Sequence, residues 1–291
     1  MHVLDSHLHL WDPARLEYDW LEGPLAGRFA EEELAAARRE DDTHAAVFVQ
    51  AGSNTDQFLD EVEWVAGIAE RTAVVGIVAG VRLDRGERTV HDLDAVAQHP
   101  LVVGVRHLLQ SEADGFAGTP AFRAGAAALA DRGLTFDACV RGVAQMRDVA
   151  ALAEALPGLP IVLDHLGKPD VGTARTPAAP SAEWSQALRA IAAHEQTFCK
   201  LSGLPAEAGG SWQAAQMEPF FDVALSAFGP DRLMFGSDWP VSAVTTDQPG
   251  SVIDVDAIGG WADAVASWAE ARDIDVDAIM RGNGADFYRL G

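Results

Sequence analysis

The sequence predicts a single-domain α/β protein with the fold of a (β/α)8 TIM barrel. Short apolar segments rich in β-branched or aromatic residues alternate along the chain with longer alanine-rich segments of helical periodicity. This alternation indicates parallel strands, and eight units at a spacing of roughly thirty residues favour a closed barrel over an open sheet. The chain has 291 residues and shows no low-complexity linker or internal repeat, so we expect residues 1–291 to form one domain.

Eight segments are expected to be strands because each is a short apolar run of β-branched or aromatic residues. In chain order they are residues 1–7, 45–50, 73–81, 101–107, 134–140, 160–166, 197–203 and 232–238. The helices expected between them repeat apolar residues at the spacing of helical turns. They include residues 31–40, 56–71, 89–99, 120–133 and 142–156.

Long connections follow the first, seventh and eighth expected strands, at residues 10–30, 204–218 and 239–258. Loops after barrel strands form the active-site face, so we expect these three loops to wall a pocket. Trp11 and Trp20 lie on the first of them and could either face a substrate or pack on the outer rim.

The composition argues against several classes of partner. The chain has 44 acidic and 21 basic residues, and the net charge of −23 would repel nucleic acid and an anionic membrane surface. No uncharged apolar run is long enough for a membrane span, and the first residues do not form a secretory signal, so we expect a cytoplasmic protein. Cys139 and Cys199 lie in different apolar segments and are expected to be reduced core residues.

Polar and ionisable residues gather at the carboxyl ends of the expected strands, whose first halves are almost wholly apolar. They are His7, His9, Gln50, Arg106, His107, Asp137, Asp164, His165, Lys200, Ser202, Ser237 and Asp238, with Lys168 just beyond the sixth strand. A barrel with a catalytic rim requires this pattern. Within the first strand, Asp5, His7 and His9 alternate and would point to the same face.

Four of these residues suit the coordination of one divalent metal ion. His7, His9 and His165 offer imidazole nitrogens and Asp238 offers a carboxylate, a set that fits Zn²⁺ with a position left for water. Such an ion makes hydroxide available at neutral pH, and an aspartate beside that water can take its proton and later deliver it to a leaving group. The alternative is a metal-free hydrogen-bonded cluster in which arginine and lysine act as the electrophiles.

The chain contains only two lysines, Lys168 and Lys200, and both lie among these residues. Arg106 and Lys200 could supply fixed positive charge to a carbonyl oxygen or a carboxylate. Arg106 could instead pair with Asp137 on the neighbouring strand, and Lys168 could be a simple loop cation. His107 should point away from Arg106, because adjacent residues of a strand face opposite sides.

Several motifs occur together in one order: DSHLHLWD, YDW, FVQ, GVRH, DHLGKP, KLSGL, MFGSDWPV and GNGADFYRL. With these motifs the chain resembles, nearly end to end, the amidohydrolase-related family of metal-dependent barrel hydrolases, and within it the sugar-lactonase branch. The resemblance implies that His7 and His9 are the first-strand pair, His165 the sixth-strand histidine and Asp238 the general base. The fourth strand lacks the lysine that bridges two metals in binuclear members, so we expect no binuclear centre. Some relatives hold one zinc ion and a dicarboxylate-specific relative uses none, so the resemblance leaves the metal requirement open.

The resemblance implies a hydrolase that opens the ring of a small sugar-acid lactone. The catalytic residues would be Asp238, His165, Arg106 and Lys200, and the residues expected to contact the substrate are Trp11, Gln50, His107, Asp137, Lys168 and Trp239. Two alternatives are a zinc-dependent decarboxylase of the same superfamily and a non-catalytic sugar-acid-binding protein. The sequence leaves the oligomeric state open, a homo-oligomer included.

Overall fold

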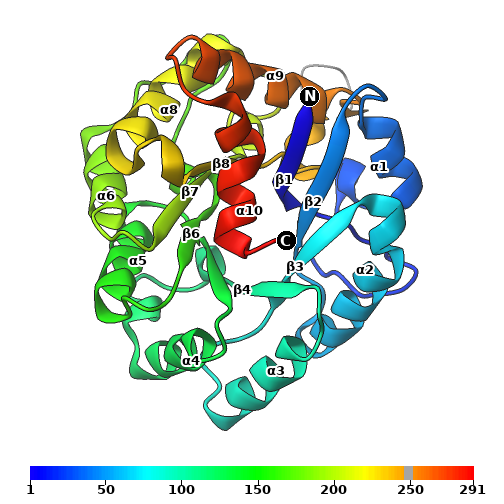
Figure 1. The fold of residues 1–291 in the computed structure, drawn as a ribbon, viewed down its shortest axis with the longest axis vertical. Coiled ribbons are helices and arrows are strands. Elements are labelled where there is room, and N and C mark those ends of the chain that lie inside the picture. The colour runs from blue at the N-terminus through cyan, green and yellow to red at the C-terminus, as the bar shows by residue number, and fades with distance from the viewer. Residues whose placement is uncertain (246–251) are drawn as a thin grey trace.

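A computed structural model describes residues 1–245 and 252–291, and these residues form the expected barrel (Figure 1). Eight parallel strands pair in chain order, each hydrogen-bonded to the next. They are β1 (His2–Leu8), β2 (Thr43–Val49), β3 (Val74–Gly80), β4 (Val102–Leu108), β5 (Thr135–Cys139), β6 (Ile161–Leu163), β7 (Thr197–Leu201) and β8 (Leu233–Phe235). The eight expected strands and the fold class are therefore confirmed.

The ring closes between the first and last strands just beyond the end of β8. Leu8 and Trp239 form a parallel bridge. The backbone N–H of His9 donates to the carbonyl of Trp239 at 2.9 Å, and the N–H of Asp238 donates to the carbonyl of His7 at 2.8 Å. The closure thus joins the two segments that carry the first-strand histidines and Asp238.

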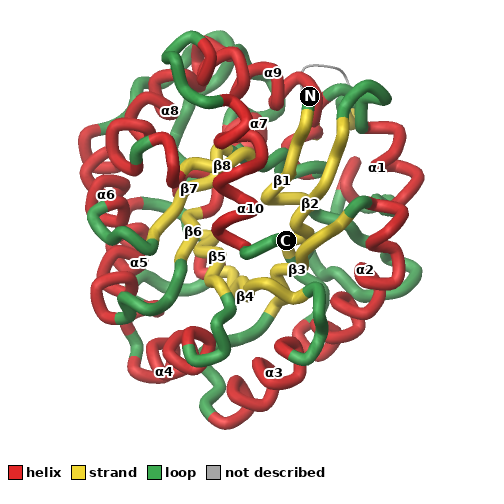
Figure 2. Tube along the Cα trace, in the orientation of Figure 1, coloured by secondary structure: helices red, strands yellow, loops and turns green. Residues whose placement is uncertain are grey.

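The helices of the described residues lie outside the ring of strands, except the last, which lies across one of its ends (Figure 2). They are α1 (Glu31–Ala37), α2 (Phe58–Thr72), α3 (Glu87–Ala97), α4 (Pro120–Ala130), α5 (Val143–Ala155), α6 (Ala182–Ala192), α7 (Leu204–Glu207), α8 (Ala214–Phe228), α9 (Ala257–Glu270) and α10 (Asn283–Tyr288). The five helices expected from periodicity correspond to α1 to α5. None of the helices in the described part of the chain is long and apolar enough to cross a membrane. A short hairpin of β9 (Val244–Thr245) and β10 (Val252–Ile253) flanks residues 246–251, the part of the expected loop 239–258 that lies outside the described residues.

Strands β6 and β8 end earlier than expected. Their carboxyl ends were expected at residues 166 and 238, whereas the strands stop at Leu163 and Phe235. His165 and Asp238 have φ angles of 53° and 55°, which lie in the left-handed region and cannot continue a strand. Both functional candidates therefore lie on tight turns directly after their strands.

The last helix, α10, lies across one open end of the ring (Figure 1). Phe287 and Tyr288 of this helix belong to the apolar cluster inside the barrel, together with Leu4, Val47, Val49, Val78, Val162 and Met234. The ring of Phe287 packs against Phe198 near the start of β7, with centroids 4.8 Å apart. Helix α10 therefore closes the amino-terminal end of the barrel and leaves the carboxyl ends of the strands for the site.

Candidate active site

Three imidazoles and one carboxylate converge at the carboxyl ends of the strands. The Nε2 atoms of His7 and His9 are 3.2 Å apart. Oδ1 of Asp238 lies 3.5 Å from Nε2 of His9, 3.9 Å from Nε2 of His7 and 3.7 Å from Nε2 of His165. All four side chains are buried; His7, His9 and Asp238 form one group that could hold a metal ion, and His165 reaches this group through Asp238.

Local backbone geometry aims His165 and Asp238 at this point. Gly203, after β7, has a φ of 72°, and a Cβ atom there would overlap the imidazole of His165, so only glycine leaves room for the ring. Nδ1 of His165 is 2.9 Å from the hydroxyl of Ser202. The hydroxyl of Ser242 donates to Oδ2 of Asp238 at 2.8 Å, which leaves Oδ1 facing the imidazoles.

The histidines are neutral and Asp238 is ionised at neutral pH. Burial lowers the pKa of His7 and of His165 well below the usual range and also lowers the pKa of His9. Burial alone would raise the pKa of Asp238, but His165, His9 and the Ser242 hydroxyl together outweigh it, and the pKa is lowered. Neutral imidazoles beside an ionised carboxylate are the protonation states in which these side chains bind a metal ion.

Three of the donor atoms, on His7, His9 and Asp238, lie within 4.8 Å of one another and could hold one cation. At metal–nitrogen distances of about 2.0–2.1 Å, neighbouring ligands of a tetrahedral ion lie about 3.3 Å apart, close to the separations among these residues. The Nδ1 of His9 lies 2.8 Å from the carbonyl of Val49, an acceptor, so His9 carries its proton on Nδ1 and presents a free lone pair on Nε2.

The charges buried around the site do not balance. Five ionised side chains are buried around this point: Asp137, Asp164, Asp238, Lys200 and Arg106. The three carboxylates exceed the two cations by one negative charge. An unbalanced charge in the interior is costly, and a divalent cation among the imidazoles would change the net charge of this group from −1 to +1.

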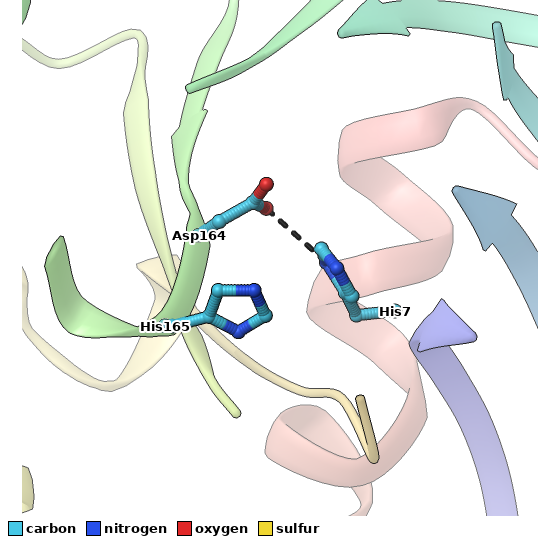
Figure 3. Close-up of side chains that lie close together, drawn as sticks. All are labelled: His7, Asp164 and His165. Carbon is cyan, nitrogen blue, oxygen red and sulfur yellow. Dashed lines mark ion pairs between the residues drawn. The ribbon is translucent and has the colours of Figure 1, made fainter. Parts of the chain in front are cut away.

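A second group that could hold a metal ion shares His7 with the first and adds Asp164 and His165 (Figure 3). Oδ1 of Asp164 lies 3.2 Å from Nδ1 of His7. Asp164 already has Lys200 at 3.0 Å and Arg106 at 3.6 Å, which occupy the place of a further cation. The pKa of Asp164 is lowered because these charges and His165 outweigh the effect of burial. We therefore assign Asp164 to the support of His7.

A chain of polar side chains crosses the barrel below His7. Nζ of Lys200 lies 3.0 Å from Nδ1 of His7 and donates to Oδ2 of Asp137 at 2.5 Å. The hydroxyl of Tyr288, on α10, donates to the same Oδ2 atom at 2.7 Å. Burial raises the pKa of Asp137 to about 6 although Lys200 opposes the shift. This chain links the helix that closes the barrel to a histidine of the site.

A cavity of about 610 Å³ opens above the four residues. His9, His165 and Asp238 line its floor, and Arg106 and Lys168 are also part of its lining. Five of the predicted site residues therefore face one space. Arg106 also borders a neighbouring cavity of about 210 Å³, to which Gln50 contributes.

The structure places the other predicted residues away from the main cavity. Lys200 and Asp137 lie in the barrel interior with no exposed surface, because each satisfies its charge with the other. Trp11 and Trp239 are buried against Phe29, on the outer side of the first loop.

His107 also points away from the main cavity, as its strand position next to Arg106 implies. Its Nδ1 accepts the backbone N–H of Leu83 at 3.1 Å, and its ring packs against Phe116 and Phe122. Nε2 lies 3.1 Å from a carboxylate oxygen of Glu112 and donates to it. Contact of a substrate with Gln50, His107, Trp11 or Trp239 stays a prediction, whereas Lys200 and Asp137 are enclosed in the barrel interior.

The cavity is also lined by Trp20, which the sequence left either facing a substrate or on the outer rim, and by Arg141 and Glu207, which are not among the predicted site residues. Trp20 lines it and donates its indole N–H to the carbonyl of Ala51 at 2.8 Å. Arg141 and Glu207 line it as well and form an ion pair at 3.2 Å. Arg141 follows the fifth strand, so the rule that found the other rim residues could have found it. Glu207 ends the short helix α7, to which the rule for strand ends does not apply, and Trp20 lies on the loop after β1.

A barrel whose strand ends bring histidines and an acid to a cavity defines the chain as an enzyme of the (β/α)8 class. The amidohydrolase family profile matches residues 4–290, and the chain belongs to this family. It is 33% identical to an L-fucono-1,5-lactonase of Burkholderia multivorans, over 99% of this chain and 96% of the relative. It is 29% identical to an L-fucono-1,5-lactonase of Burkholderia ambifaria, over 99% of this chain and 95% of the relative. Its fold matches the crystal structure of a Burkholderia multivorans amidohydrolase with bound zinc at a TM-score of 0.82 and 30% identity, covering 100% of each chain.

Proposed function

We propose that this protein hydrolyses the ring ester of a small sugar-acid lactone. The observation that carries the proposal is Asp238, a buried and ionised carboxylate on the floor of the cavity. A binding protein needs no buried base, whereas hydrolysis needs a group that takes a proton from water. Two relatives named L-fucono-1,5-lactonase, which align over 99% of this chain, support the choice of substrate class.

The lining of the cavity suits a small polar ring. Its volume of about 610 Å³ lies in the range of about 300–1,000 Å³ for small-molecule sites. Trp20 offers an aromatic surface to the apolar face of such a ring. Two of the cations in the lining are paired with acids, Arg106 with Asp164 and Arg141 with Glu207. This pairing favours a neutral substrate over a dianion.

In the proposed reaction Asp238 takes a proton from a water molecule, and the resulting hydroxide attacks the lactone carbonyl. Arg106 and Lys168, which line the cavity, supply positive charge to the oxygen atom that becomes negative. The protonated Asp238 then gives its proton to the ring oxygen as the carbon–oxygen bond breaks. The product is an open-chain hydroxy acid, which leaves as its carboxylate.

His7, His9, His165 and Asp238 would hold one divalent cation, and zinc suits the nitrogen-rich donor set. When bound, the ion supplies Lewis acidity that polarises a carbonyl oxygen or acidifies water. In this proposal Lys200 and Asp137 act on His7 from below and do not touch the substrate. Their distances from His7 and from each other support that role.

The proposal is tested by a lactone panel assayed for acid release in a pH-stat, with as-purified and chelator-treated protein. Metal content is measured on both samples. We expect release of one acid equivalent per molecule of an aldonolactone. Release of CO₂ from aromatic acids without lactone opening would identify a decarboxylase instead, and binding of sugar acids without turnover of any lactone would identify a binding protein.

A further inference from the structure

Nδ1 of His7 lies between a hydrogen-bond donor and a hydrogen-bond acceptor. Nζ of Lys200 is 3.0 Å from this atom and Oδ1 of Asp164 is 3.2 Å from it. A neutral imidazole nitrogen either carries a proton and donates or lacks one and accepts. His7 can therefore satisfy Lys200 or Asp164 through Nδ1, but not both at once.

When Lys200 donates to Nδ1, the proton of the neutral His7 ring is on Nε2. That proton points to Nε2 of His9, 3.2 Å away. His9 can accept it because its own proton, on Nδ1, is directed to the carbonyl of Val49. This tautomer completes a run of hydrogen bonds from Lys200 to Val49 without a metal ion, although Nη1 of Arg106, 3.4 Å from Nε2, then finds no acceptor on His7.

When Nδ1 carries the proton and donates to Asp164, Nε2 of His7 has a free lone pair. Only this tautomer can bind a cation through Nε2. Lys200 then directs its N–H bonds to Asp137 at 2.5 Å and Asp164 at 3.0 Å. His7 loses a proton from Nε2 and gains one on Nδ1, so the ring stays neutral and Lys200 keeps its charge.

We propose that Lys200 and Asp164 are positioning residues that select the tautomer of His7 and so set the affinity of the site for a divalent cation. The inference rests on the metal site proposed above. Lys200 favours the metal-free cluster, and Asp164 favours the cluster that accepts a cation. The metal-bound and metal-free forms left open by the sequence would thus be two tautomers of one site.

Lys200 is held in place from the far side of the barrel. Oδ2 of Asp137 accepts hydrogen bonds from both Lys200 and Tyr288. All three residues are buried, with Lys200 and Asp137 fully enclosed. Because Tyr288 belongs to α10, docking of this helix fixes the distance between Lys200 and His7.

The test is a two-bond ¹H–¹⁵N spectrum of full-length protein labelled with ¹⁵N-histidine, which shows which ring nitrogen carries the proton. The resonances of His7 are identified by their loss in His7→Gln. In chelator-treated wild-type protein we expect the His7 proton on Nε2, and after one equivalent of Zn²⁺ we expect it on Nδ1. His9 is the internal control, because Val49 should keep its proton on Nδ1 in both samples.

Two variants separate the two positioning residues. Asp164→Asn should weaken Zn²⁺ binding about 10- to 100-fold in competition with a fluorescent chelator, the usual effect of losing a partner behind a ligand. Asp114→Asn, on the surface, is the matched control and should leave Zn²⁺ affinity unchanged. In Lys200→Met the His7 proton should be on Nδ1 even without Zn²⁺.

Three results would overturn the inference: a His7 proton on Nδ1 in the metal-free wild type, no Zn²⁺ binding by the wild type, or unchanged Zn²⁺ affinity in a folded Asp164→Asn protein. The wild-type spectra decide the matter even if Lys200→Met does not fold. None of these measurements uses a lactone, so failure of the proposed lactonase activity would be seen separately.

Discussion

The carboxylate of Asp5 accepts two hydrogen bonds from Ser237, one from the backbone N–H at 2.8 Å and one from the hydroxyl at 2.5 Å. Ser237 immediately precedes Asp238, whose own N–H is bonded to the carbonyl of His7. The first strand therefore carries two ligands of the proposed metal site and also fixes the turn that presents Asp238. A mutation that displaces this strand would therefore disturb the general base Asp238 and the proposed metal ligands His7 and His9 together.

Replacement of Asp238 by asparagine should abolish most turnover while the protein stays folded. The amide cannot take a proton from water, and loss of a general base lowers kcat by about 10²–10⁴-fold. The measurements are kcat in a pH-stat and binding of the product acid by calorimetry, which should remain close to wild type. The exposed Asp231 gives the control variant Asp231→Asn. Wild-type kcat in Asp238→Asn would rule out Asp238 as the base.

Replacement of His9 by glutamine should lower the affinity for a divalent cation by at least about 100-fold, more than loss of a residue that only supports a ligand. The reason is that His9 belongs with His7 and Asp238 to a group of side chains that could hold a metal ion. Metal content after dialysis, measured by mass spectrometry, checks the prediction. His91→Gln is the control, because the His91 side chain is 77% exposed. Equal metal content in the two variants would contradict the proposed ligand set.

Replacement of Lys168 by methionine should lower kcat/KM by about 10- to 100-fold. This is the effect of losing a hydrogen bond to a charged group, which contributes about 1.5–3 kcal/mol. Within the described ranges, Lys168 is the one cation of the main cavity without a carboxylate within 4.0 Å; Nζ donates to Oε1 of Gln110 at 2.5 Å. Its charge is therefore available to the substrate. Arg123→Met, on the exposed face of α4, should have wild-type kinetics. Unchanged kcat/KM in Lys168→Met would make Lys168 a structural loop cation.

Replacement of Glu61 by glutamine should stabilise the protein at pH 8 but not at pH 4. Burial raises the pKa of Glu61 to about 7, whereas the pKa of a glutamate in the unfolded chain is about 4.3. The folded state binds this proton more tightly, so the free energy of unfolding falls as the pH rises from about 4 to 7. At about 1.4 kcal/mol per pKa unit, ionisation of the folded protein at this residue costs up to about 4 kcal/mol of stability.

Urea unfolding of Glu61→Gln at several pH values measures this effect. Glutamine keeps the oxygen that accepts the N–H of Ala51 at 3.2 Å, so the variant changes the charge and little else. Glu63→Gln, exposed on the same helix, is the control and should follow the pH dependence of the wild type. A difference between Glu61→Gln and wild type that does not grow with pH would contradict the assigned cause.

The barrel and its rim could be predicted because both follow from periodicity. Strand and helix patterns alternate along the whole chain, and parallel strands must bring their carboxyl ends to one side. That geometry alone places His9, His165 and Asp238 near one another, although they are far apart in sequence. The predicted convergence needed no knowledge of side-chain packing.

Other details depend on packing and could not be predicted. The pairing of β1 with β2 is irregular between Asp5 and Leu8, so strict alternation fails there. Asp5 consequently bonds to Ser237, whereas alternation placed it with His7 and His9. Lys200 points into the barrel interior as strand alternation requires, since Phe198 two residues earlier packs against the interior cluster; only the structure shows that Lys200 pairs there with Asp137.

The role of Tyr288 could not be predicted either, although this residue lies in the terminal motif GNGADFYRL. A helix beyond the eighth strand has no fixed place in a (β/α)8 pattern, so periodicity cannot say that it enters the barrel. Only the packed structure shows the hydroxyl of Tyr288 at Asp137. The sequence shows only that a tyrosine lies in a short segment after the eighth strand, and nothing in it indicates Asp137 as the hydrogen-bond partner.

The contact between Tyr288 and Asp137 has a consequence for synthesis on the ribosome. A nascent chain can form strands β1 to β8 in order, but Asp137 and Lys200 stay hydrated from below until residue 288 has emerged and its helix docks. A chain that stalls before that point would hold every histidine of the rim and still lack the sealed interior that orients them. The interior of the barrel is therefore sealed only when the last helix docks, after all the rim residues have been translated.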